Sequence, residues 1–167
     1  MTGREVGYST RAFTFAAGHR YHVDGWSPEE NRRVFGALTV AHGHNYTLEV
    51  TVRGPIDART GMVMDLAELK RIVGEAVVSR FDHADLNADL LFAGKVPTTE
   101  NIAVATWGLL APKLGTERLW RVRLWEDPTK VPLPSVAVSG VDVRKASRTS
   151  APGTAAPASR GRRACLP

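Results

Sequence analysis

The sequence has almost no cysteine and no long apolar run, and each absence excludes a class of protein. Its 167 residues include one cysteine, Cys165, so an intrachain disulfide framework is excluded and a reducing cytoplasmic location is expected. No apolar run approaches the roughly 20 residues that cross a bilayer. The N-terminal segment MTGREVGYSTR also lacks the apolar stretch of a signal peptide. We therefore expect a cytoplasmic protein without a membrane partner.

Acidic residues are missing from the C-terminal end, so the net charge of +5 comes from that segment and not from the rest of the chain. The basic residues from position 143 onward are Arg144, Lys145, Arg148, Arg160, Arg162 and Arg163. Removing these six charges from +5 leaves about −1 for residues 1–142, which is a poor match to a nucleic-acid-binding surface. Segment 143–167 is rich in Ala, Ser, Pro and Gly. Because it has few large apolar groups, we expect a folded domain over 1–142, a disordered basic tail over 143–167, and no specific nucleic-acid partner.

The spacing of apolar residues predicts several strands. Residues 44–54 alternate between apolar and polar side chains, as expected of a strand with one buried face. Further strands are expected over 11–21 and 119–127, with a short one over 61–65. Residues 22–33 have the composition of a loop.

Two helices are expected between the third and the last strand. The first begins at Asp65 as its N-cap and frays near residue 81. The second begins at Thr98 and ends near Pro112. Antiparallel strands with two helices grouped on one face make an α+β fold.

Histidines at the ends of the first two strands predict a metal site. His42 and His44 are two residues apart, so in extended backbone both imidazoles point to the same side. If the two strands pair antiparallel, His19 lies beside them. Three imidazole nitrogens with no fourth protein ligand describe a catalytic zinc site. The alternative for His42 and His44 is a pair of surface histidines at a strand end.

Five short segments occur together in a distinctive order. They are FAAGH at 15–19, GALTVAHGHNY at 36–46, FDHADLN at 81–87, PTTEN at 97–101 and LWED at 124–127. From about residue 11 to about residue 130, the chain resembles the 6-pyruvoyltetrahydropterin synthase and 6-carboxytetrahydropterin synthase family. The resemblance implies a tunnelling fold, in which each subunit contributes a twisted antiparallel sheet to an oligomeric barrel. It also implies a homo-oligomer, either a trimer or a hexamer.

The resemblance assigns roles to residues within these segments. The implied zinc ligands are His19, His42 and His44. The implied catalytic residues are Asp82, His83 and Glu126. A carboxylate beside a histidine fixes its tautomer and raises its basicity, so Asp82 would orient His83 and His83 would relay a proton. The alternative for this pair is a cap at the C-terminal end of a helix.

Substrate binding is implied for Thr98, Thr99 and Glu126. The Glu126 carboxylate suits a pterin because it can accept hydrogen bonds from the 2-amino and N3–H groups of the ring. The alternative for the two threonines is an N-cap of the following helix. His22 is expected to lie in a loop near the site without binding the metal.

The sequence departs from the family at one catalytic position. Family members usually carry a cysteine a few residues before HGH, whose thiolate accepts a proton. Here the segment from Gly36 to Ala41 is shorter and has no cysteine, and Leu38 lies nearest to the expected place. The replacements considered are Glu29 or Glu30, His83, and a zinc-bound hydroxide. Cys165, in the expected tail, is a poor substitute.

These features predict a zinc-dependent lyase acting on 7,8-dihydroneopterin triphosphate. The preferred product is 6-carboxytetrahydropterin, as in a deazapurine or queuosine-type pathway, because that is the commoner assignment for bacterial chains of this kind. The 6-pyruvoyl product remains open. The alternative of a different class is a zinc- and pterin- or purine-binding paralogue without turnover, which the missing cysteine favours and the Asp82–His83 pair opposes.

Overall fold

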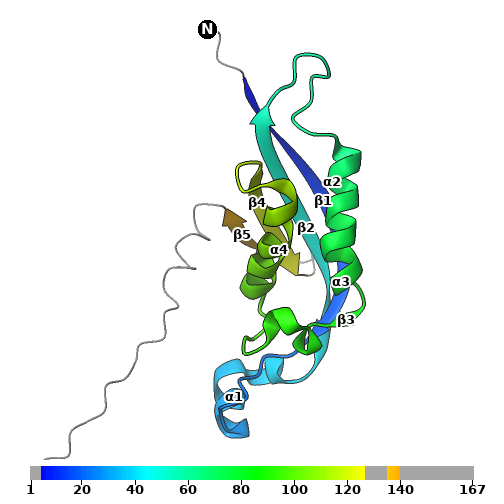
Figure 1. Ribbon diagram of the computed structural model, residues 1–167. Coiled ribbons are helices and arrows are strands. Elements are labelled where there is room, and N and C mark those ends of the chain that lie inside the picture. The colour runs from blue at the N-terminus through cyan, green and yellow to red at the C-terminus, as the bar shows by residue number, and fades with distance from the viewer. Residues whose placement is uncertain (1–4, 127–134, 140–167) are drawn as a thin grey trace, which may run out of the picture.

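Among the residues that the structure describes, one five-stranded sheet forms the frame of the molecule (Figure 1). The structure, a computed structural model, describes residues 5–126 and 135–139. The strands are β1 (Val6–His19), β2 (His42–Pro55), β3 (Ala84–Asp85), β4 (Leu119–Glu126) and β5 (Ser135–Ser139). They lie in the order β3–β1–β2–β4–β5. All neighbours pair antiparallel except β3, which is parallel to β1.

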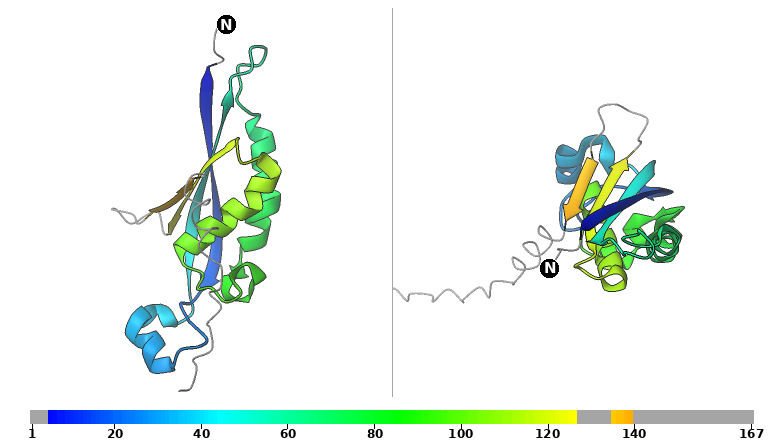
Figure 2. Two further views of the ribbon diagram at one scale, coloured as in Figure 1. Left: turned by 60° about the vertical axis from the view of Figure 1, so that its left-hand side comes forward. Right: turned by 90° about the horizontal axis from the view of Figure 1, so that it is seen from above.

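Helices cover one face of this sheet (Figure 2). They are α2 (Leu66–Val73), the π-helical turn η2 (Gly74–Val78), α3 (Ser79–Phe81) and α4 (Thr99–Leu114). The short 3₁₀ turns η3 (Leu86–Ala88) and η4 (Leu90–Phe92) lead from β3 toward α4. The helix α1 (Pro28–Phe35) and the turn η1 (Gly36–Thr39) lie beyond the end of the sheet where β1 finishes and β2 begins (Figure 1).

The core lies between the sheet and these helices. Alternate residues of β2 are fully buried, and they are Tyr46, Leu48, Val50 and Val52. The helices contribute Leu69, Val73, Val77, Ile102 and Leu110, each with no exposed surface. The period of two on the strand and the helical spacing opposite it therefore produce one continuous apolar layer. The expected α+β class, with two helical segments on one face, is confirmed.

Both long helices begin at the expected caps. Asp65 accepts a hydrogen bond from the N–H of Ala67 at 2.8 Å, and Thr98 accepts one from the N–H of Asn101 at 3.3 Å. Each cap satisfies a backbone donor that the first helical turn leaves without an intrahelical partner.

The strand expected over 61–65 is wrong. The Asp57 carboxylate accepts hydrogen bonds from the N–H groups of Arg59 at 3.0 Å and Thr60 at 2.9 Å, which closes a tight turn. Gly61 follows with a φ of 69°, in the region that glycine adopts without steric cost. The chain then passes into the cap of α2 without pairing with another strand.

The loop expected over 22–33 contains α1. Ser27 accepts a hydrogen bond from the N–H of Glu30 at 3.1 Å, and Pro28 occupies the first helical position. These are ordinary signals for the start of a helix. The expectation of a loop gave too much weight to the Asp, Gly and Ser-Pro residues before it.

The sheet also differs at its edges from the expected antiparallel arrangement. The two-residue strand β3 makes the sheet mixed, because Ala84 pairs in parallel register with Ala17. β5 was not expected, and β1 begins at Val6 rather than at residue 11. Short edge strands carry too few residues for periodicity to reveal them.

Two expectations from composition concern membrane spans and the C-terminal tail. Among the described residues, no helix is long and apolar enough to cross a membrane. The expected tail over 143–167, with Cys165, lies outside the described residues. The domain division at residue 142 therefore stays a prediction.

Asn31 holds the loop between β1 and β2 together. Its side chain is 2% exposed and accepts a hydrogen bond from the N–H of Val23 at 2.8 Å. Its amide group donates to the carbonyls of Val23 at 3.1 Å, Ser27 at 3.2 Å and Trp26 at 3.3 Å. One buried side chain thus satisfies backbone groups on both sides of the turn that precedes α1.

We predict that Asn31→Ala loosens this loop locally. Leaving buried backbone groups unpaired costs about 1–3 kcal/mol, so opening should become about tenfold more frequent. Limited proteolysis mapped by mass spectrometry should show faster cleavage between residues 22 and 36. The control is Arg32→Ala, which alters an exposed neighbour on the same helix. Equal cleavage rates in the two variants would contradict this role.

Candidate metal centre

Three histidines converge where β1 and β2 meet. His19, the last residue of β1, lies directly opposite His42, the first residue of β2. His44 is two residues further along β2. The ring centroids are 4.6 Å apart for His19 and His42, and 5.1 Å apart for each other pair. One potential ligand atom from each residue lies within 4.8 Å of the others, so the group could hold a metal ion.

Two backbone carbonyls determine which ring nitrogen faces this centre. The Nδ1 of His19 lies 2.7 Å from the carbonyl oxygen of Pro97, and the Nδ1 of His42 lies 2.7 Å from that of Val40. A carbonyl oxygen can only accept, so in the neutral ring each Nδ1 carries the proton and donates it. Each Nε2 then keeps its lone pair.

These two Nε2 atoms are buried without a hydrogen-bond partner. Burial also lowers the pKa of His19 below its usual value, more than the Pro97 carbonyl and Glu126 raise it. A buried acceptor without a partner is costly in a folded protein, and a cation would satisfy both atoms at once. A neutral imidazole with Nδ1–H bonded to a carbonyl is also the usual state of a metal-binding histidine. The residues present therefore fit a metal ion.

Glu126 and Thr99 border the histidine group. Thr99, the first residue of α4, donates a hydrogen bond from its hydroxyl to the Glu126 carboxylate at 2.5 Å. The other carboxylate oxygen lies 3.9 Å from the Nε2 of His44. Thr98 is the N-cap of α4, and its hydroxyl oxygen accepts a hydrogen bond from the N–H of Asn101. Of the two threonines, the structure thus places Thr99 beside Glu126 and uses Thr98 as a cap.

Tyr21 borders the histidine group, although no pattern in the sequence selected it. Its ring is nearly perpendicular to the rings of His19 and Phe35, with centroids 5.3 Å and 5.7 Å away. Burial and the nearby Glu126 carboxylate raise the pKa of Tyr21 to about 12, against the smaller opposing effect of Thr99. The phenol is therefore a neutral hydrogen-bonding group near neutral pH. Its position two residues after His19 is the one signal that could have identified it.

Asp82 and His83 are held against the backbone of β1. Ala16 donates its N–H to the Asp82 carboxylate at 2.9 Å and accepts the N–H of His83 at 2.6 Å. The second Asp82 oxygen lies 3.1 Å from the Nδ1 of His83. The Ala16 N–H and, to a smaller extent, His83 lower the pKa of Asp82. The carboxylate is thus ionised and oriented toward the imidazole.

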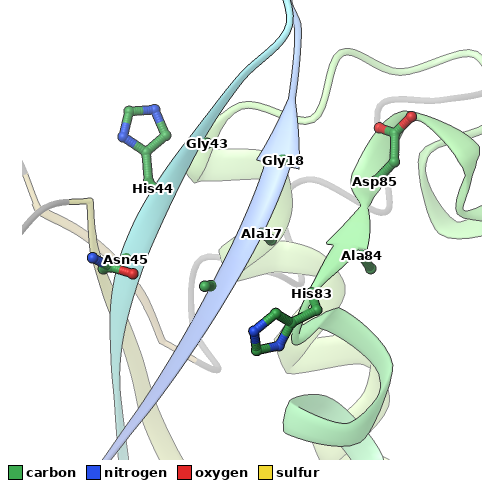
Figure 3. A pocket seen from close by; sticks show the side chains of 9 residues that line it. Ala17, Gly18, Gly43, His44, Asn45, His83, Ala84 and Asp85 are labelled. Carbon is green, nitrogen blue, oxygen red and sulfur yellow. The ribbon is translucent and has the colours of Figure 1, made fainter.

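His83 is strained and exposed. Its φ of 58° is the one positive value among the described non-glycine residues, a conformation that costs free energy and clusters at functional sites. Its side chain is 83% exposed, and it lies outside the histidine group. It lines an open hollow of about 510 Å³ together with His44 and Asn45. Figure 3 shows β1 running between the strand that carries His44 and the segment that carries His83.

The positions considered for the missing cysteine differ in their surroundings. The Leu38 side chain is 42% exposed, and its carbonyl accepts the N–H of Tyr21 at 2.8 Å. Glu29 and Glu30 lie in the first turn of α1. The N–H of Glu29 itself and the side chain of Ser27 lower the pKa of Glu29, which makes this carboxylate a weaker base. Glu30 lies 3.7 Å from Arg33.

Comparison with known proteins identifies the family. A sequence model described as 6-pyruvoyl tetrahydropterin synthase matches residues 8–132, which hold every residue of the histidine group and its border. The chain belongs to this family. The expected resemblance is therefore confirmed over most of the domain.

Individual relatives agree with this assignment. The 6-pyruvoyl tetrahydrobiopterin synthase of Drosophila melanogaster is 42% identical over 135 residues, covering 78% of this chain and 80% of the relative. The Homo sapiens protein of the same name is 42% identical over 125 residues, covering 73% of this chain and 86% of the relative. A putative 6-carboxy-5,6,7,8-tetrahydropterin synthase of Archaeoglobus fulgidus is 44% identical over 89 residues, covering 53% of this chain and 70% of the relative.

Solved structures show the same fold. The Caenorhabditis elegans 6-pyruvoyl tetrahydropterin synthase superposes with a TM-score of 0.74 at 31% identity. The alignment covers 83% of this chain and all of that one. The expected tunnelling fold of the single chain is therefore confirmed.

We predict that His42→Ala removes bound metal from the protein. The variant loses one buried Nε2 from the centre, and even outer-shell changes weaken metal sites about 10- to 100-fold. Purified wild-type protein, analysed by inductively coupled plasma mass spectrometry, should hold about one transition-metal ion per chain, and the variant should hold almost none. His22→Ala, which changes a histidine outside the group, is the matched control. Undiminished metal in His42→Ala would exclude His42 as a ligand.

Proposed function

We propose that the chain is a zinc-dependent lyase acting on 7,8-dihydroneopterin triphosphate. The observation that carries the proposal is the pair of buried Nε2 atoms without partners on His19 and His42. They lie in one group with His44, next to the hydrogen bond between Thr99 and Glu126. The names of the relatives, which are pterin synthases, support this class of reaction.

The donor set suits zinc. Three imidazole nitrogens without a described carboxylate or thiolate in the group are typical of catalytic zinc, with a fourth position for water or substrate. Bound there, zinc would lower the pKa of a coordinated hydroxyl group of the substrate and stabilise negative charge on its oxygen. The role of His19, His42 and His44 is to hold the ion in a fixed place at the strand ends.

Glu126 would orient the pterin ring. A carboxylate has enough lone pairs to keep the Thr99 hydrogen bond and still accept from the 2-amino and N3–H groups of the ring. Thr99 restrains the carboxylate, so less orientational freedom is lost when substrate binds. Tyr21 closes the same side of the group and offers a neutral phenol there.

His83 is our candidate for the proton-transfer group that works without the family cysteine. Asp82 faces its Nδ1, which leaves the Nε2 available to a substrate. The imidazole is exposed in the single chain. The strained backbone of His83 is held in place by the hydrogen bonds of Ala16 to Asp82 and His83. Glu29 fits this task less well because its lowered pKa makes it a weaker base. Leu38 has no acidic or basic group.

We also propose that the chain functions as a homo-oligomer, a trimer or hexamer. Among the described residues, β3 and β5 are the outer strands of the sheet, and closure of several such sheets into a barrel would pair these outer strands.

The product follows from which bonds break after proton transfer. Loss of triphosphate alone leads to a 6-pyruvoyl product, and further loss of a carbon fragment leads to a 6-carboxy product. The names of the two relatives with the longer matches favour the 6-pyruvoyl product over the 6-carboxy product preferred from the sequence. A binding protein without turnover is the second candidate, favoured by the absence of a cysteine before HGH.

One incubation separates these outcomes. Zinc-loaded protein is given 7,8-dihydroneopterin triphosphate, and the products are identified by mass spectrometry. We predict release of triphosphate with formation of the 6-pyruvoyl product. Acetaldehyde and a 6-carboxy product would instead assign the second reaction, and tight pterin binding without any product would contradict the enzyme assignment.

The variant His83→Ala serves as the matched test of catalysis. Removal of a general acid or base typically lowers a rate about 10²–10⁴-fold, whereas binding of the ring at Glu126 should persist. The described contacts of the imidazole are with exposed groups, so the variant should fold normally. Unchanged turnover would assign proton transfer to another residue.

A further inference from the structure

A row of aromatic rings connects the helix α1 to the metal centre. Trp26 stacks on Phe35, with centroids 5.8 Å apart and an interplanar angle of 17°. Tyr21 stands nearly perpendicular to both the Phe35 ring and the His19 ring, at 5.7 Å and 5.3 Å. Its backbone N–H also donates to the Leu38 carbonyl at 2.8 Å. Because two rings and a backbone hydrogen bond restrain Tyr21, its hydroxyl group has a defined place.

This hydroxyl group lies beside the Thr99–Glu126 hydrogen bond. After burial, the groups that most raise the pKa of the phenol are the carboxylates of Glu126 and Glu100. Thr99 lowers this pKa through hydrogen bonding that favours the phenolate. These residues lie at the end of β4 and in the first turn of α4. The phenol oxygen of Tyr21 therefore faces the same part of the site as the Glu126 carboxylate.

The proton of the Tyr21 hydroxyl group is available to a ligand. The Thr99 hydroxyl proton is already donated to Glu126 at 2.5 Å, and the Thr99 N–H acts on the phenol oxygen as a donor. Within the part of the chain that the structure describes, no protein group accepts a hydrogen bond from the Tyr21 hydroxyl. Beside Glu126 there is thus a neutral hydroxyl group with a proton to donate.

The edge of a 2-amino-4-oxo ring needs such a donor. Its 2-amino and N3–H groups donate hydrogen bonds, whereas the neighbouring 4-oxo oxygen accepts one. A carboxylate only accepts, so Glu126 satisfies the two donors and leaves the 4-oxo oxygen without a partner. A desolvated carbonyl oxygen without a donor weakens binding. A neutral hydroxyl group next to the carboxylate supplies what this ring edge lacks.

We propose that Tyr21 is a specificity-determining residue whose hydroxyl group donates a hydrogen bond to the 4-oxo oxygen of the ring. The orientation of the ring at Glu126 in this proposal rests on the proposed function. Tyr21, which follows β1, and Glu126, which ends β4, would together recognise one edge of the ring. The site would therefore favour 2-amino-4-oxo rings over rings that carry a poor acceptor at position 4.

Fluorescence titration with two ring compounds tests this contact without any turnover. The probes are pterin, which carries the 4-oxo oxygen, and 2-amino-4-thioxopteridine, whose sulfur is a weaker acceptor. Wild-type protein should bind pterin more tightly than the sulfur compound. Tyr21→Phe should bind pterin about tenfold more weakly than the wild type does and should bind both probes nearly equally. Equal affinity of the wild type and Tyr21→Phe for pterin would overturn the proposal.

Two controls separate the hydroxyl contact from general effects. Tyr8→Phe removes the same group from a tyrosine that is 56% exposed near the start of β1. It should change the affinity for pterin less than about twofold. Tyr21→Phe keeps its ring against His19, so its metal content should equal that of the wild type. Loss of metal together with pterin affinity would mean that the phenol supports the metal centre, and would overturn the proposal.

Kinetics provide a second readout and distinguish this inference from the proposed function. Tyr21→Phe should raise the KM for 7,8-dihydroneopterin triphosphate about tenfold. A loss confined to kcat, at unchanged ring affinity, would assign the hydroxyl group to the chemistry and overturn its role in specificity. Turnover by a wild type whose pterin affinity is indifferent to Tyr21→Phe would overturn the inference alone. Pterin binding that depends on Tyr21, in a protein that does not convert the substrate, would refute the proposed function and leave the inference standing.

Discussion

The hydrogen bonds from His19 to Pro97 and from His42 to Val40 are the constraint on which the site depends. Each assigns the imidazole proton to Nδ1 and turns Nε2 inward, where neither atom has a hydrogen-bond partner. The antiparallel register places the two residues opposite each other, and a potential ligand atom of each lies within 4.8 Å of the other. Strand pairing thus fixes the backbone positions of the two histidines, and the carbonyls fix the orientation of their rings.

The same contact organises the neighbouring chain. Pro97 lies immediately before the Thr98 cap and the Thr99–Glu126 hydrogen bond, so the segment that orients His19 also positions the carboxylate proposed to bind the ring. In the segment that follows β1, Tyr21 packs against the His19 ring. One short stretch of backbone, from Pro97 to Thr99, therefore contacts both the histidine group and Glu126.

Sequence patterns predicted the parts of this arrangement that depend on local chemistry. The alternation in β2 follows from strand periodicity, and the caps at Asp65 and Thr98 follow from residue type. The closeness of His19 to His42 was expected on the condition that their strands pair antiparallel, as they do. The tautomer of His19 could not be predicted, because the Pro97 carbonyl that fixes it is 78 residues away in the chain. The helix α1 was missed although Ser27 and Pro28 signal its start, and the strand expected over 61–65 was wrong because turn chemistry at Asp57 outweighed a short apolar run.

The zinc centre is the central claim, and X-ray absorption spectroscopy at the zinc edge of the metal-loaded protein tests it most directly. The account predicts three imidazole nitrogens at about 2.0–2.1 Å and one further light-atom ligand. In His42→Ala any zinc taken up should show one imidazole fewer. A spectrum of the wild-type protein dominated by carboxylate oxygens, or by a sulfur ligand at about 2.3 Å, would contradict the centre described above.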